Sequence, residues 1–110
     1  MTLRVAVTGA TGFIGRYIVR SLLQHGHQVV GAVRNPTKVP SLAATEGVEL
    51  RVADLGDKTA LARAFVGCDA VVSNAGVISL GSYGLDELIA ANVQGTRNVF
   101  EAMAEVGVRR

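Results

Sequence analysis

Three glycines spaced three residues apart near the N-terminus constrain this chain more than any other feature. Gly9, Gly12 and Gly15 lie between an apolar, β-branched run that ends at Thr8 and an apolar helical pattern. In such a strand–turn–helix unit, Gly9 permits the tight turn, Gly12 allows a ligand close to the backbone, and Gly15 lets the helix pack on the sheet. The N–H groups that begin the helix can then bind an anion. This context predicts a dinucleotide site rather than a plain glycine-rich turn.

The composition fits one domain with a hydrophobic core. The chain has 110 residues, of which 49% are hydrophobic, and its net charge of +2 comes from scattered basic residues. Because these form no run, nucleic acid is not expected as a partner. The single cysteine, Cys68, excludes an internal disulfide and a CxxC metal site, and we interpret it as a small buried residue entering a strand. No signal peptide or membrane span is recognisable, so the cytoplasm is the expected compartment.

Strand and helix patterns alternate along the whole chain without a linker or an internal repeat. Apolar or alternating runs predict strands at residues 3–8, 28–33, 48–52 and 70–73. Between them we expect a helix that ends at Gly26, a weak helix at 37–44, and a helix at 58–65 capped by Asp57. The first of these helices has an apolar stripe at Ile14, Ile18, Leu22 and His25.

The last helix has the clearest pattern and is expected to end at Gly107. Its i, i+3/i+4 stripe contains Leu85, Leu88, Ile89, Val93, Thr96, Phe100 and Met103. Parallel strands joined by right-handed crossovers form a doubly wound sheet, here of order 3-2-1-4. The fold class is therefore α/β, with a partial Rossmann-type doubly wound sheet. Its strands and helices alternate along the chain as β-α-β-α-β-α-β-α. Its ligand crevice is expected at the ends of strands 1 and 4, where residues 9–15 and 73–76 emerge.

Four segments resemble the extended short-chain dehydrogenase/reductase family, which includes NAD-dependent epimerases and dehydratases. They are TGATGFIG at 8–15, ADL at 53–55, SNAG at 73–76 and NVQGTRNV at 92–99. The resemblance implies cofactor contacts from Thr11, Phe13 and Ile14 in the first segment. It also implies that Asp54 hydrogen-bonds the adenine amino group with the backbone of Leu55 close by, and that Asn74, Ala75 and Gly76 pass beside the adenine ribose.

Two of these residues have plainer interpretations. Asp54 could simply end the third strand. Asn92, by the resemblance, helps to support a catalytic water and lysine, but it could equally be a hydrogen-bonding residue between helix and strand.

The end of the second strand indicates which cofactor is preferred. An NAD site usually has an acid there, which accepts hydrogen bonds from the ribose hydroxyls. This chain has Arg34 instead, within the run Ala-Val-Arg-Asn at 32–35. A guanidinium can pair with a 2′-phosphate and stack on adenine, so NADP(H) is favoured over the alternative, NAD(H). Arg16 is a second candidate for this phosphate, although a solvent-facing helix position is the simpler interpretation.

The family's catalytic tyrosine, followed four residues later by a lysine, is missing from these 110 residues. Only Tyr17 and Tyr83 are present, and Ser21 and Glu87 follow them at that spacing. We therefore expect an incomplete domain that binds cofactor without catalysing, and that meets a small-molecule substrate only together with a C-terminal region and a fifth strand. The reaction expected of the whole protein is carbonyl or alcohol oxidoreduction, as in dihydroflavonol reductase or hydroxysteroid dehydrogenase relatives. A sugar-nucleotide epimerase or dehydratase, a non-enzymatic NADP-sensing module and a vestigial scaffold are the alternatives.

Two expectations concern surfaces. The fourth strand would be an apolar edge and the last helix would keep part of its stripe uncovered, which predicts self-association. The loop at 77–84, with Ser79, Ser82 and Tyr83, could touch the substrate end of the cofactor or could be a solvated connection.

Overall fold

A parallel four-stranded sheet forms the centre of the protein. The computed structural model describes residues 1–76 and 84–110. The strands are β1 (Arg4–Thr8), β2 (Gln28–Val33), β3 (Val48–Val52) and β4 (Ala70–Ser73). Their order is β3-β2-β1-β4, and every neighbouring pair is parallel. The predicted topology is thus confirmed, and the carboxyl ends of β1 and β4 lie side by side at the switch in strand order.

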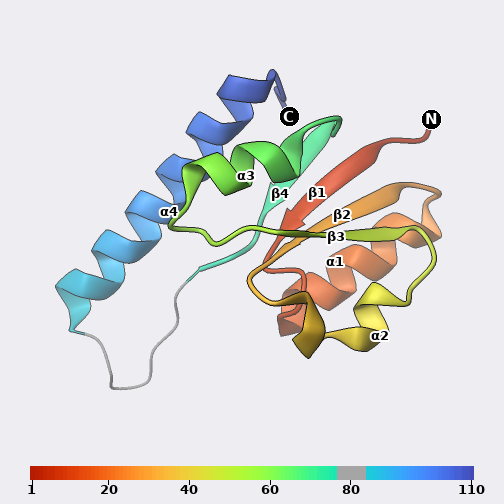
Figure 1. The fold of residues 1–110 in the computed structure, drawn as a ribbon, viewed down its shortest axis with the longest axis horizontal. Coiled ribbons are helices and arrows are strands. Elements are labelled where there is room, and N and C mark those ends of the chain that lie inside the picture. Colours follow the sequence, from red (N-terminus) through yellow and green to blue (C-terminus); the bar gives the residue numbers. More distant parts are fainter. Residues whose placement is uncertain (77–83) are drawn as a thin grey trace.

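Helices cover both faces of the sheet. Figure 1 shows α1 (Phe13–Gln24) and the short α2 (Pro40–Ala43) on one face, and α3 (Lys58–Phe65) and α4 (Leu85–Val106) on the other. The Asp57 side chain caps α3 by accepting the Ala60 N–H at 3.0 Å, as the sequence predicts. Gly107 ends α4 in the left-handed region, with φ of 78°.

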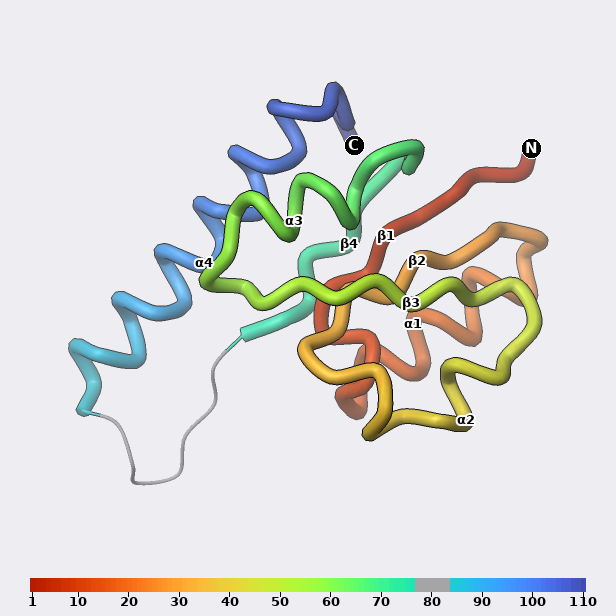
Figure 2. The backbone as a smooth tube through the Cα atoms, in the orientation of Figure 1, coloured from red at the N-terminus to blue at the C-terminus, as the bar shows by residue number. Residues whose placement is uncertain are grey.

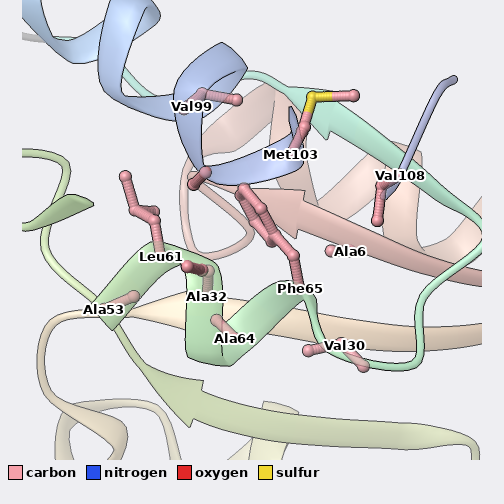
Figure 3. Close-up of a cluster of buried hydrophobic side chains, with 12 residues drawn as sticks. Ala6, Val30, Ala32, Ala53, Leu61, Ala64, Phe65, Val99, Met103 and Val108 are labelled. Atoms are coloured by element: carbon pink, nitrogen blue, oxygen red, sulfur yellow. The ribbon is translucent and has the colours of Figure 1, made fainter. Parts of the chain in front are cut away.

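Each face of the sheet has its own apolar cluster. Alternate residues of β1 point to opposite faces, so Val5 and Val7 pack beneath α1, whereas Ala6 packs beneath α3 and α4. Figure 3 shows the second cluster, in which the Phe65 ring lies between the sheet and the Val99–Met103 turn of α4. Phe65 is completely buried. The Phe65 side chain thereby packs α3 against both the sheet and α4.

The expected helix at 37–44 is wrong in detail, because two shorter elements replace it. A 3-10 turn, η1 (Pro36–Lys38), is followed by α2, and Val39 between them has a φ of −133° and a ψ of 58°, outside the helical region. Proline disfavours the helical conformation of the residue before it, so Pro40 interrupts the helix at Val39.

Cys68 also differs from expectation, since it is only partly buried against the core. Burial raises the pKa of its thiol, and the nearby charges of Arg51 and Arg4 oppose that change.

The buried faces of α1 and α4 agree with the expected stripes only in part. In α1, Ile18 and Leu22 pack against the apolar cluster as expected, but Gly15 and Val19 are the buried residues and Ile14 is 62% exposed. In α4, the buried face contains Gly95, Asn98, Val99, Ala102 and Met103. The expected stripe is largely exposed at Leu85, Ile89, Val93 and Phe100. Close packing against α3 selects the face with small residues, and hydrophobicity alone does not identify that face. Within the described residues, no helix is long and apolar enough to cross a membrane.

Candidate functional site

A cleft of about 690 Å³ opens at the carboxyl ends of the strands, a volume typical of ligand sites. Each predicted cofactor residue except Gly15 lines it: Gly9, Thr11, Gly12, Phe13, Ile14, Arg34, Asp54, Leu55, Asn74, Ala75 and Gly76. The tube in Figure 2 shows why segments so distant in sequence meet here, since β1, β2, β3 and β4 all end toward this edge. The cleft therefore lies at the topological switch point.

The glycine turn forms an open anion cradle at one end of the cleft. Gly9 has a φ of 67° and lies against the next loop, because a Cβ there would be 2.9 Å from the Ala75 nitrogen. Gly12 is the N-cap of α1, and no side chain caps the helix or places an acid in its first turn. A Cβ on Gly12 would meet only the Gly9 oxygen, at 3.5 Å. The uncapped N–H groups of α1 thus face space that a phosphate can fill.

Gly15 serves the packing of α1 rather than the lining of the cleft. It is buried, and a Cβ on it would overlap the carbonyl oxygen of Gly9 and lie 2.9 Å from the Gly9 carbon. The helix therefore begins closer to the turn than any side chain would allow. This contact sets the direction in which the first-turn N–H groups of α1 point.

The hydroxyl of Thr8 joins the ends of β1 and β4, a role that the motif did not reveal. Its Oγ1 accepts the backbone N–H groups of Asn74 and Ala75 at 3.0 and 3.1 Å. The Asn74 amide also donates to the Gly9 carbonyl at 3.2 Å. Thr8 is only 2% exposed. The only available signal was a β-branched residue with a hydroxyl placed immediately before Gly9.

The opposite part of the cleft is a shallow apolar bed with an acid at its rim. Asp54 is exposed at the end of β3, and its Oδ1 accepts the Gly56 N–H at 2.9 Å. This turn leaves the second carboxylate oxygen available for a ligand, so the two interpretations of Asp54 are compatible. The bed also contains three small or branched residues that sequence reasoning missed: Ala32, Ala53 and Leu61.

The two arginine candidates are separated by the fold. Arg34 is exposed and lines the cleft directly after β2, and it forms no salt bridge with any described residue. Arg16 does not line this cleft. It borders a second groove, between α1 and α2, together with Arg20 and Leu42. Of the two arginines, only Arg34 therefore lines the cleft at the ends of the strands.

Asn92 faces the same loop from α4. Its Nδ2 donates to the Leu88 carbonyl at 3.0 Å, and a Cβ on Gly76 would lie 2.9 Å from its Oδ1. Asn92 thus packs closely against the end of the predicted ribose segment. The candidate substrate contacts Ser79, Ser82 and Tyr83 lie outside the described residues.

Comparison with known proteins agrees with this geometry. Residues 9–110 match a family described as NAD(P)H-binding. Cinnamoyl-CoA reductase 1 of Oryza sativa is 41% identical over 96% of this chain and 32% of its own length.

Two solved structures resemble the whole fold. A short-chain dehydrogenase/reductase superfamily protein of Agrobacterium tumefaciens with bound NAD is 34% identical, with a TM-score of 0.76 over 97% of this chain and 30% of that protein. The NADPH-dependent quinone oxidoreductase QOR2 of Escherichia coli, complexed with NADPH, is 37% identical, with a TM-score of 0.73 over 94% and 34%. The chain spans about a third of the length of these relatives.

The resemblance to the extended short-chain dehydrogenases and reductases is therefore confirmed. With its glycine cradle, its switch-point cleft and a family match from Gly9 to Arg110, the chain is an NAD(P)-binding domain and belongs to the NAD(P)H-binding family.

Proposed function

We propose that this domain binds NADP(H) in preference to NAD(H), as the cofactor-binding portion of an oxidoreductase that acts on a carbonyl or alcohol. The observation that carries the preference is Arg34, which lines the cleft where an NAD site has an acid. No acidic residue occupies positions 32–35. A guanidinium at this position would pair with the 2′-phosphate that distinguishes NADP from NAD.

The remaining contacts follow from the lining of the cleft. The pyrophosphate would bind the uncapped N–H groups in the first turn of α1, which follows Gly12. The adenine would lie on Ala32, Ala53 and Leu61, with its amino group toward the free oxygen of Asp54. Asn74, Ala75 and Gly76 would pass beside the adenine ribose, and the nicotinamide would extend beyond Gly9, away from the adenine. When bound, the cofactor supplies or accepts a hydride, and this chain orients it.

Arg34→Ala is expected to weaken NADPH binding by about 10- to 100-fold, because a charge-assisted pair contributes roughly 1.5–3 kcal/mol. NADH binding should change little, since NADH has no 2′-phosphate. Fluorescence titration of both cofactors measures the two effects. Arg20→Ala is the matched control, because it removes the same charge from the surface of α1 outside the cleft. Equal losses for NADPH and NADH would contradict the assignment of Arg34.

The reaction of the whole protein is also a proposal. Reduction of a carbonyl is favoured because the curated relative described above is a reductase and the Val-Arg ending of β2 fits NADP(H). We further propose that a fifth strand lies beside β4, followed by the Tyr-x-x-x-Lys pair. In support of this, the Val71 N–H of β4 donates to the Arg110 carbonyl at 2.8 Å. The outer edge of β4 can therefore pair with the backbone of a following segment. The 110-residue chain alone is expected to bind NADPH without oxidising it.

We also propose that the chain self-associates through the outer face of α4. Four exposed apolar side chains follow one another along this face: Leu85, Ile89, Val93 and Phe100, which are 72%, 52%, 52% and 63% exposed. Exposed apolar side chains that share one face of a helix favour association.

The double variant Ile89→Lys, Val93→Lys is expected to shift the isolated chain from a self-associated species to a monomer. Light scattering after size exclusion, over a range of concentrations, measures the change. Val66→Lys is the control, because Val66 is 54% exposed but lies at the end of α3. A wild-type chain that is monomeric at every concentration would rule out association through α4.

A further inference from the structure

The middle of α4 contains a buried amide whose partner is a cofactor-site residue. Asn98 is 7% exposed, and with Thr8 it is one of the two buried polar residues among those described. Its Nδ2 donates to the Leu55 carbonyl at 2.9 Å, and its Oδ1 accepts from the Gln94 Nε2 at 2.9 Å. The first bond joins α4 to the β3–α3 turn across 43 residues of sequence. Asn98 itself does not line the cleft.

A second contact holds the β3–α3 turn against α4, at Gly95, which lies one helical turn before Asn98. A Cβ on Gly95 would overlap the Leu55 side chain and lie 2.7 Å from its Cγ. The absence of a side chain at residue 95 therefore creates the space that Leu55 occupies. Figure 1 shows the segment between β3 and α3 meeting the middle of α4. Leu55 is thus held through its backbone by Asn98 and through its side chain by Gly95.

The β3–α3 turn contains the residues predicted to contact the adenine. Asp54 and Leu55 both line the cleft. Within the turn, the Asp54 carboxylate accepts the Gly56 N–H, and the Asp54 carbonyl accepts the Asp57 N–H at 2.9 Å. These local bonds fix the shape of the turn. Its position relative to the apolar bed depends on contacts from outside the turn, and Asn98 supplies the hydrogen bond from α4.

We propose that Asn98, with Gly95, is a positioning residue for the adenine end of the cofactor. Asn98 fixes the depth of the Asp54–Leu55 turn in the cleft and so places the Asp54 carboxylate relative to the adenine amino group. A buried amide is costly to desolvate and is retained where it makes specific hydrogen bonds. The inference rests on the proposed binding of NADP(H), because it acts only on the adenine part of that site.

Two variants test the proposal with 2′,5′-ADP and NADPH as ligands. Asn98→Leu keeps the approximate volume and removes the bond to Leu55. Gly95→Ala leaves Asn98 in place, favours the helix intrinsically, and displaces the Leu55 side chain. We expect Asn98→Leu to bind both ligands about tenfold more weakly, as the loss of one net hydrogen bond implies. Gly95→Ala should weaken binding of both ligands by a similar factor, because the displaced Leu55 side chain moves the same turn. Affinity is measured by calorimetry at a temperature where circular dichroism shows every variant to be folded.

Val99→Ala is the matched control for stability. Val99 is the neighbouring residue of α4, 1% exposed, and belongs to the core cluster. Its truncation should lower the thermal midpoint while leaving both affinities near those of the wild type. A merely structural role for Asn98 would make Asn98→Leu behave like Val99→Ala, and that result overturns the proposal. Should Asn98→Leu fail to fold, Gly95→Ala decides alone, with wild-type affinity as the contrary result. A wild-type chain that binds neither ligand would instead overturn the proposed function.

Discussion

Replacing Gly15 with alanine is expected to lower the free energy of unfolding by more than about 3 kcal/mol, because overpacking against immobile atoms is strongly destabilising. The added Cβ would overlap the carbonyl oxygen of Gly9, a backbone atom that cannot rotate away. That carbonyl is also held in place, since it accepts the Gly12 N–H at 3.1 Å and the Asn74 amide at 3.2 Å. Relief would require α1 to move away from β1. Urea denaturation followed by circular dichroism measures the loss.

Gly12→Ala provides the contrast within the same motif. At Gly12 the φ is −74°, and a Cβ would make only an ordinary contact with the Gly9 oxygen. Stability should therefore change by less than about 1 kcal/mol, in either direction. Dinucleotide binding should nevertheless be lost, because the methyl group would stand where the pyrophosphate approaches α1. If Gly15→Ala were as stable as the wild type, the proposed close packing of α1 on the turn would be wrong.

Truncating Phe65 to alanine should cost about 3–5 kcal/mol, the usual range for a fully buried aromatic side chain. Its ring is completely buried beneath α4 and fills the space between the sheet and Met103 (Figure 3). No neighbouring element can close such a cavity without moving α3 relative to α4. Because small domains have only about 5–15 kcal/mol of stability, much of the total would be lost.

Val66→Ala is the control for this prediction. Val66 is the next residue, at the C-terminal end of α3, and it is 54% exposed. Its truncation should change stability by about 0.5 kcal/mol or less. Thermal denaturation of both variants measures the difference. Similar midpoints for Phe65→Ala and Val66→Ala would show that the α3–α4 cluster does not stabilise the domain as described.

The sequence predicted the architecture because each element has a local signal. The bounds expected for α3 and β4 agree with the structure, since Asp57 marks the start of α3 and the run at 70–73 is short and apolar. The strand order followed from the handedness of parallel crossovers, which does not depend on detailed packing. Periodicity failed where a helix has two apolar faces. In α4, the face that contacts α3 carries Gly95 and Ala102, and the more hydrophobic stripe is exposed.

The same distinction holds for the candidate site. The glycine motif and the acid after β3 could be located from sequence, because they occupy fixed places in strand–turn–helix units. The roles of Thr8 and Asn98 could not, since their partners lie 66 and 43 residues away and involve backbone groups. Backbone acceptors and donors leave no side-chain signal at the partner position. Only the fold brings these pairs together.

The most direct test of the central claim is a titration of the chain with NADPH and NADH by isothermal calorimetry. We expect one site, with NADPH bound at least about tenfold more tightly than NADH because of the single charge-assisted contact from Arg34. We also expect Gly12→Ala to abolish binding of both cofactors in a folded chain. Binding of neither cofactor by the wild type would contradict the dinucleotide site itself. Tighter binding of NADH than of NADPH would contradict the role of Arg34.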